Sequence, residues 1–199
     1  MSTIEVNTIT PISGSSDVTL GGSSKNIKFA SGTTVDFSTN TPTISGITQG
    51  VTTIDRWRVG TTFTNSLDPI VWSQNTDSDS PSLGTAMTHS SGIFTFPQTG
   101  FWLINAYATG ATAASAGNTN YHVAFSTDSG SNYSQLCAGL QAVQTYQQFN
   151  IICLAFFDVT NISTHRLKVY INTPSGASVY GQNNGNNLTR IDFLRIGDT

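Results

Sequence analysis

Hydrophobic residues beyond residue 50 alternate with polar ones in short runs, and Gly-, Asn- and Ser-rich turns separate the runs. Alternation with a period of two is typical of strands that bury one face. The pattern predicts strands at residues 57–62, 69–72, 83–87, 92–96, 101–107, 121–125, 133–143, 149–158, 166–171, 177–180 and 188–196. Short strands in such close succession indicate an all-β sandwich or jelly roll.

Two of these segments need further argument. In residues 133–143, Leu136, Leu140 and Val143 also fit one face of a helix, but Gly139 and the flanking strands favour a strand. The longest apolar run, residues 151–157, has seven residues. It is too short to span a membrane and has the length of a buried strand.

Residues 1–50 follow a different pattern, in which apolar doublets such as Val18-x-Leu20 and Val35-x-Phe37 are separated by Gly and Ser turns. Burying a large apolar side chain stabilises by about 1.5–3 kcal/mol, whereas ordering one residue costs about 1–2 kcal/mol. So few doublets cannot order fifty residues unless several copies share one core. We therefore expect a β-structured stalk at 1–50, in which several copies share a core as in a triple-stranded β-prism or a shared β-helix, and a sandwich or jelly-roll head at 51–199; the family resemblance described below implies the trimeric stalk and the jelly-roll head. The alternative is a disordered N-terminal arm.

The two cysteines test the hairpin that the pattern predicts. If residues 133–143 and 149–158 form a hairpin that turns near Thr145, Cys137 and Cys153 are equidistant from the turn and face each other across the ladder. Both a cross-strand disulfide and two free thiols fit this geometry. The Cys-x-x-Cys spacing of zinc and redox sites is missing.

Composition excludes several classes of protein. The formal net charge is −3, only 10% of residues are charged, and the few basic residues are scattered, which argues against a nucleic-acid binder. Aromatic residues make up 10% of the chain and β-branched residues are frequent, which argues against overall disorder. The first ten residues lack the charged and apolar regions of a signal peptide, so we expect synthesis in a cytosol.

Catalytic and metal-binding motifs are missing from the sequence. It contains no nucleophile elbow, P-loop, dinucleotide fingerprint or zinc-protease motif. His89, His122 and His165 are far apart, and the acidic pair around Ser78 lacks the spacing of a calcium loop. We therefore expect no catalytic residue, no metal site and no cofactor, and a role in binding or structure instead of an enzyme.

Candidate binding residues are aromatic or amide side chains at expected strand ends and turns. Flat rings and amides beside polar loops suit carbohydrate or protein recognition. The candidates are Trp72, Tyr146, Tyr180, Asn183, Asn184, Asn186 and Asn187. The alternative is that the rings cap the core or fill a subunit interface and that the Asn-rich loop is a long turn.

Two segments of the head resemble a known family. Residues 92–104, GIFTFPQTGFWLI, resemble the strand–turn–strand signature of the tumour-necrosis-factor-like and complement-globular-head jelly roll, with Trp102 and Ile104 in place of the usual Tyr and Phe. Residues 187–197, NLTRIDFLRIG, resemble its closing strand. The resemblance implies a homotrimer in which aromatic and aliphatic side chains meet on the three-fold axis, and a role in binding and assembly.

The N-terminal segment is similar to the start of fibre proteins of tailed bacteriophages, through VNTI at 6–9, VTLG at 18–21 and FASGTTVDF at 29–37. This similarity implies a homotrimeric virion protein made in the host cytoplasm, most simply a tail fibre for host attachment. Its N-terminal segment would contact other virion proteins and its head a host surface glycan or protein, without nucleic acid or membrane insertion. The alternatives are a head fibre or capsid-decorating protein, a non-viral carbohydrate-binding module and, ranked last, a polysaccharide-degrading enzyme.

Overall fold

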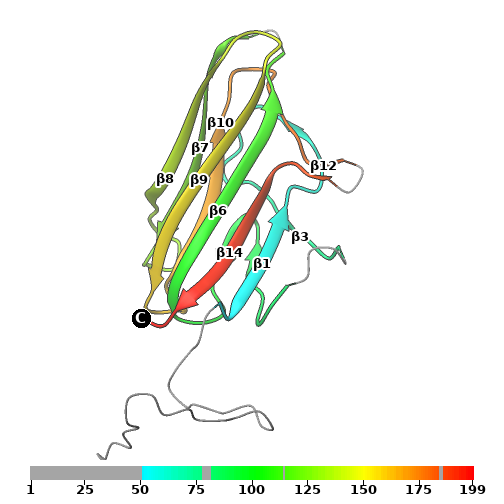
Figure 1. Cartoon of the computed structure of the whole chain (residues 1–199). Helices are drawn as coiled ribbons and strands as arrows, with labels where there is room; N and C mark the ends of the chain where they lie inside the picture. Colours follow the sequence, from blue (N-terminus) through cyan, green and yellow to red (C-terminus); the bar gives the residue numbers. More distant parts are fainter. Residues whose placement is uncertain (1–50, 78–81, 114, 184–185) are drawn as a thin grey trace, which may run out of the picture. The chain divides into compact units, whose positions relative to one another are not determined.

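The computed structural model describes residues 51–77, 82–113, 115–183 and 186–199, and in them the chain forms an all-β sandwich of two antiparallel layers (Figure 1). The predicted stalk at 1–50 lies outside the described residues. Sheet A contains β1 (Thr53–Arg58), β2 (Phe63–Thr64), β3 (Ser73–Gln74), β6 (Gly100–Ala111), β9 (Gln148–Val159), β11 (Ser178–Val179) and β14 (Arg190–Gly197). The strand order is β2-β11-β6-β14-β1-β3, and β9 pairs with the other side of β6.

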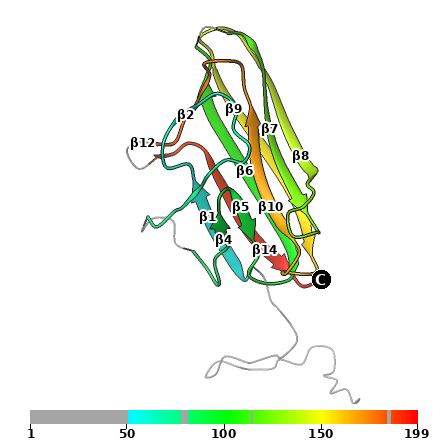
Figure 2. The same cartoon turned by 180° about the vertical axis from the view of Figure 1, so that it is seen from behind.

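Sheet B forms the second layer, which faces the viewer in Figure 2. It contains β4 (Thr88–Ser90), β5 (Ile93–Thr95), β7 (Gly117–Ser126), β8 (Ser134–Val143) and β10 (Arg166–Asn172), in the order β4-β5-β10-β7-β8. A short ribbon of β12 (Gln182–Asn183) and β13 (Asn186–Asn187) extends from one side. None of the residues described here belongs to a helix long and apolar enough to cross a membrane.

The core lies between the sheets and is filled by alternate residues of the long strands. Along β6, Trp102 and Ile104 are fully buried, whereas Phe101 is exposed. The strand therefore alternates as predicted. Aromatic rings fill the centre: Phe94 packs 4.8 Å from Phe193 and Phe96 packs 5.3 Å from Trp102, measured between ring centroids. This cluster joins residues from β5, β6 and β14 and so ties the two layers together.

The period-two pattern located the long strands to within a few residues and failed at the short ones. No strand forms at 69–72 or along 83–87, where Leu83 makes only an isolated bridge to Ile54, and the first strand runs from Thr53 to Arg58 instead of 57–62. These segments are apolar because Ile70, Trp72 and Met87 are buried. They are loops that place single side chains in the core. Their amino-acid composition resembles that of short strands, so the pattern predicted strands there.

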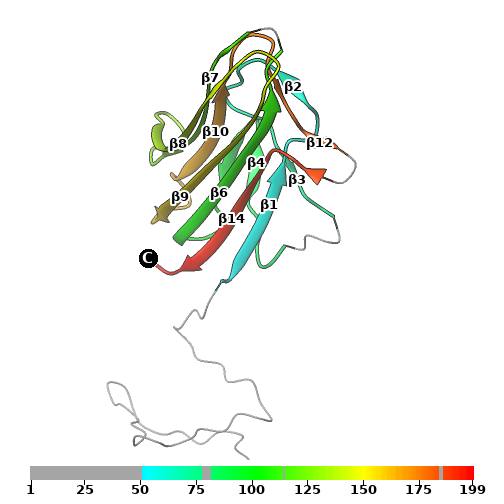
Figure 3. The same cartoon turned by 45° about the horizontal axis from the view of Figure 1, so that its top comes forward.

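The expected hairpin between β8 and β9 needs correction. The two strands share a tight turn, but β8 pairs only with β7 and β9 only with β6, so they enter different sheets (Figure 3). The two cysteines still meet across the gap between the layers: the thiol of Cys153 lowers the pKa of Cys137 through a hydrogen bond, and both are free thiols. A Cβ at Gly139 would lie 2.3 Å from Ile151 Cγ2, so glycine permits this close approach of the layers.

The loop between β7 and β8 is held by one carboxylate. Asp128 Oδ1 accepts hydrogen bonds from Ser126 Oγ at 2.6 Å and from the backbone N–H of Asn132 at 2.9 Å, and Oδ2 accepts one from Asn132 Nδ2 at 2.7 Å. These donors stabilise the ionised carboxylate and lower the pKa of Asp128 to about 2. The turn therefore directs the chain into β8 with a fixed geometry.

A second carboxylate organises the start of sheet A from inside. Asp55 is 1% exposed, and its Oδ2 accepts hydrogen bonds from Trp57 Nε1 at 2.7 Å and from the backbone N–H of Met87 at 2.8 Å. Its Oδ1 accepts one from Gln74 Nε2 at 3.0 Å. The side chain thus joins β1 to β3 and to the loop before β4.

Replacing Asp55 with alanine leaves three donors without their acceptor, two of them at buried positions. We expect Asp55→Ala to lower the free energy of unfolding by about 3 kcal/mol, since each unsatisfied buried group costs about 1–3 kcal/mol. Denaturant unfolding at one fixed protein concentration measures the change. The control is Asp68→Asn, which removes a surface ion pair and costs less than about 1 kcal/mol. Equal losses in the two variants would contradict this role of Asp55.

The Asp128 carboxylate should titrate unusually low. Because its pKa is lower in the folded chain than the ordinary value of 3.8, it contributes stability above that value, and the contribution is lost as the pH falls towards 2. A pH titration of its side-chain carbonyl signal by NMR should give a midpoint near 2. A midpoint close to 3.8 would show that the turn's hydrogen bonds do not persist in solution.

Candidate functional site

One face of β9 is apolar although it is not covered. The strand alternates strictly, with Phe149, Ile151, Cys153, Ala155, Phe157 and Val159 buried in the core. On the opposite face, Ile152, Leu154 and Phe156 are 57%, 57% and 63% exposed. Large apolar side chains that are exposed in consecutive outward positions of one strand mark an interaction surface.

The neighbouring strands extend this surface across sheet A. The ladders place Phe156 opposite Leu103, Leu103 opposite Leu194, and Leu194 opposite Ile54, so one apolar side chain from each of β9, β6, β14 and β1 falls in a single row. We call the outward apolar side chains of sheet A the apolar face. Its members are Ile54, Phe101, Leu103, Ile152, Leu154, Phe156, Leu194 and Ile196.

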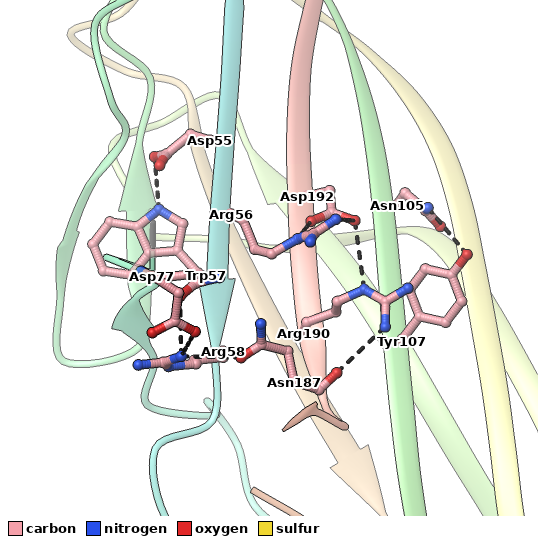
Figure 4. Close-up of polar contacts among 11 residues, drawn as sticks. Asp55, Arg56, Trp57, Arg58, Asp77, Asn105, Tyr107, Asn187, Arg190 and Asp192 are labelled. Atoms are coloured by element: carbon pink, nitrogen blue, oxygen red, sulfur yellow. Dashed lines mark hydrogen bonds and ion pairs between the residues drawn. The ribbon is translucent and has the colours of Figure 1, made fainter. Parts of the chain in front are cut away.

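A charged network lies beside the apolar face on the same side of sheet A (Figure 4). Arg56 donates to Asp192 at 2.5 and 3.2 Å, and the Arg190 Nε lies 3.7 Å from the same carboxylate. The guanidinium of Arg190 also lies 4.0 Å above the ring of Tyr107, whose hydroxyl accepts a hydrogen bond from Asn105. The hydrogen bond to Asp192 raises the pKa of Arg56. The network gives this corner fixed shape and charge.

A third arginine anchors the loops at the end of β1. Arg58 Nη1 donates to Asp77 Oδ2 at 2.5 Å, to Asn75 Oδ1 at 3.0 Å and to Asn187 Oδ1 at 3.1 Å (Figure 4). It therefore ties β1, the loop after β3 and β13 together. The charged groups of these ion pairs bind one another and the neighbouring loops, and none of them is a nucleophile. In the part of the chain that the structure describes, no three His, Cys, Asp or Glu side chains gather as metal ligands would.

The candidate residues from the sequence are scattered in the structure. Trp72 is a correction: it is 4% exposed and packs 6.2 Å from Phe94, so it fills the core instead of presenting a ring to solvent. Tyr146 is 81% exposed in the turn between β8 and β9. Tyr180 follows β11 and is half-buried, with its backbone N–H bonded to Thr109 O. No ring contact joins these three aromatic residues within the described chain.

The asparagine candidates also differ in their positions and do not form one site in the described chain. Asn187 has a structural role, because its side chain and its backbone carbonyl accept hydrogen bonds from Arg58 and Arg190. Asn183 and Asn186 pair through the backbone of the β12–β13 ribbon. Asn184 lies outside the described residues. The base of the ribbon is thus joined to sheet A by Asn187.

Sequence reasoning missed the apolar face, although its signal was present. The length of the unbroken apolar run 151–157 predicted a buried strand, and the prediction did not distinguish its two faces. An antiparallel strand of a two-layer sandwich buries only one face within its own chain. Apolar residues in both sets of alternate positions therefore indicate that the second face is covered by something else.

The comparisons with known proteins identify the architecture. No protein-family model matches the sequence, and no curated protein matches it. Among solved structures, Eiger TNF from S. frugiperda superposes with a TM-score of 0.59 at 13% identity, over 76% of this chain and 96% of that one. Murine APRIL at pH 5.0 gives 0.55 at 10% identity, over 72% of this chain and 98% of that one. The described part of the chain has the tumour-necrosis-factor-like jelly-roll fold.

Proposed function

We propose that this protein is the subunit of a homotrimeric virion fibre, a phage tail fibre whose jelly-roll head is presented for attachment to the host surface. The observation that carries the proposal is the apolar face. Three large side chains of β9 are more than half exposed, and apolar residues of three further strands continue the surface. Exposed apolar patches of this kind mark surfaces that contact a partner.

A sister chain is the partner that fits this surface. The apolar face is asymmetric, because it runs along β9 at the edge of sheet A and then across the sheet, next to the charged corner of Arg56, Asp192 and Arg190. An asymmetric surface favours contacts between unlike parts of sheet A on two copies, and such contacts form a ring when the rotation that relates the copies closes. The resemblance of residues 92–104 to a trimeric family supports a ring of three.

The charged corner supports the same proposal. Apart from this network, the surface has few ions, since only 10% of the residues are charged. Asp192 offsets part of the positive charge of Arg56 and Arg190, which lowers the cost of docking a second chain beside them. A surface of apolar residues beside partly offset charges is suited to a permanent contact and would keep that contact in salt water.

The placement on a virion rests on the N-terminal segment. Its repeated apolar doublets need copies to share a core, and its similarity to phage fibre proteins suggests the particle on which those copies assemble. A role in binding and assembly instead of catalysis agrees with the ion pairs of Arg56, Arg58 and Arg190, because each of them joins structural elements. A capsid-mounted head fibre would use the same trimer at a different position.

The trimer is tested by mass and by one substitution. The full chain should sediment at about three times 21.2 kDa, and Leu154→Asp should shift it to a monomer because it places a charge in the proposed interface. The matched control is Leu140→Asp, since Leu140 is 67% exposed but lies on β8 of sheet B. Near-UV circular dichroism shows whether each variant is folded. A monomeric wild type, or equal effects of the two substitutions, would contradict the proposal.

The position on the particle is tested separately. Gold-labelled antibody raised against the head should bind the tail of particles that carry this protein, as seen by electron microscopy. Particles from which its gene has been removed provide the control. Label on the capsid would contradict the tail-fibre assignment and favour the head fibre. Label at neither position would contradict a virion role.

A further inference from the structure

A polar depression lies on the outer side of sheet B, on the opposite layer of the sandwich from the apolar face. Its volume is about 270 Å³, and side chains of β7, β8, β10 and the loop before β3 line it. Ala124 forms part of its floor: it is only 2% exposed although polar and aromatic side chains surround it. A trimer built through sheet A leaves this surface open.

The centre of the depression is an ion pair framed by two rings. Lys168 Nζ lies 2.8 and 3.1 Å from the two carboxylate oxygens of Asp68. The same ammonium is 4.8 Å from the ring centroid of Tyr133 and 5.3 Å from that of Tyr170, within the range of cation–π attraction. The Lys168 side chain is 18% exposed and that of Asp68 is 49% exposed. The pair is therefore fixed in position yet reachable by a ligand.

The rings and amides around the ion pair are held in place before any ligand binds. His122 stacks on Tyr170 with the ring centroids 4.4 Å apart and the planes 7° apart. The Nδ1 of His122 lies 2.9 Å from Gln135 Oε1, which fixes the Gln135 amide at the rim. Tyr133 follows the loop that Asp128 stabilises, and burial raises the pKa of its phenol, so that it is a protonated donor at neutral pH. Such preorganisation reduces the entropy cost of binding.

The chemistry of this depression selects one class of ligand. Its one cation and one anion neutralise each other, which disfavours phosphates and other anions that would have to displace Asp68 from Lys168. A pair of adjacent hydroxyl groups is complementary to it, because one hydroxyl donates to the carboxylate while the other accepts from the ammonium. Amides at Gln135 and Asn172 and the phenol of Tyr133 supply further partners, and aromatic rings contact the C–H faces of sugars.

We infer that the depression formed by Asp68, Tyr133, Gln135, Lys168, Tyr170 and Asn172 binds one ring of a neutral saccharide. Its volume lies just below the usual range of about 300–1,000 Å³ for ligand pockets, which suits a single sugar ring. The inference deepens the proposed attachment function by assigning a ligand class and a surface, and it rests on that function for its biological meaning. None of its residues belongs to the candidates that the sequence suggested.

Saturation-transfer NMR on the full chain tests the inference. The probes are the neutral methyl pyranosides of glucose, galactose, mannose and N-acetylglucosamine, with a methyl sialoside as the anionic comparator. We expect at least one neutral pyranoside to bind, and we expect Tyr133→Ala and Asp68→Asn each to weaken it about tenfold or more. Tyr146→Ala is the matched control, because Tyr146 is a tyrosine that is 81% exposed in a different loop. This substitution should leave binding within about twofold.

Three results would overturn the inference. They are no binding of any neutral probe, binding of the sialoside alone, and binding that Tyr146→Ala weakens as much as Tyr133→Ala. Circular dichroism and the sedimented mass are recorded for every variant, so that loss of folding or assembly is not taken for loss of binding. A wild type that is monomeric but binds the sugar would contradict the trimer and leave the saccharide site intact, so the two proposals fail separately.

Discussion

The surface of this molecule is governed by one strand that is apolar on both faces. β9 supplies Phe149, Ile151 and Phe157 to the core and leaves Ile152, Leu154 and Phe156 exposed on the other side. Covering one such side chain is worth about 1.5–3 kcal/mol, so the exposed face represents a large unused driving force in an isolated chain. In the proposed trimer, association through sheet A uses this driving force, and the second layer stays free to contact other molecules.

The ionic groups agree with this division of the two layers. On sheet A, Asp192 offsets part of the charge of Arg56 and Arg190 next to the apolar face, which makes this surface easier to bury. On sheet B, the Lys168–Asp68 pair lies in an open depression among tyrosines and amides, which makes a surface that can bind hydroxyl groups. Because only 10% of the residues are charged, the positions of these ion pairs help to distinguish the face proposed for association from the face proposed for ligand binding.

Much of the fold could be predicted from the sequence, because long strands in a two-layer sandwich repeat their burial pattern. The segments at 101–107, 121–125, 149–158 and 166–171 all lie within observed strands. Loops such as the one carrying Trp72 could not be told from short strands, since a single buried side chain has no period. The shared turn of β8 and β9 was foreseen, but local pattern does not say that its two arms enter different sheets.

The sites were less predictable than the fold. Lys168 and Asp68 are 100 positions apart in the sequence, and only the fold brings them together beside Tyr133. The similarity of residues 92–104 to the tumour-necrosis-factor-like signature agrees with the fold that Eiger TNF shares at 13% identity. Fold and signature together do not identify a ligand, because the sequence signal lies in core and turn positions and the depression lies outside them.

Hydroxyl-radical footprinting of the native assembly tests the central claim most directly, because it reports the exposure of individual side chains. Phe156 is 63% exposed and Tyr146 is 81% exposed in the single chain. If sheet A is the contact between copies, Phe156 will be protected from oxidation in the assembly and will become reactive on dissociation, while Tyr146 will react in both states. Strong oxidation of Phe156 in the native assembly, comparable to its reactivity after dissociation, would contradict the account.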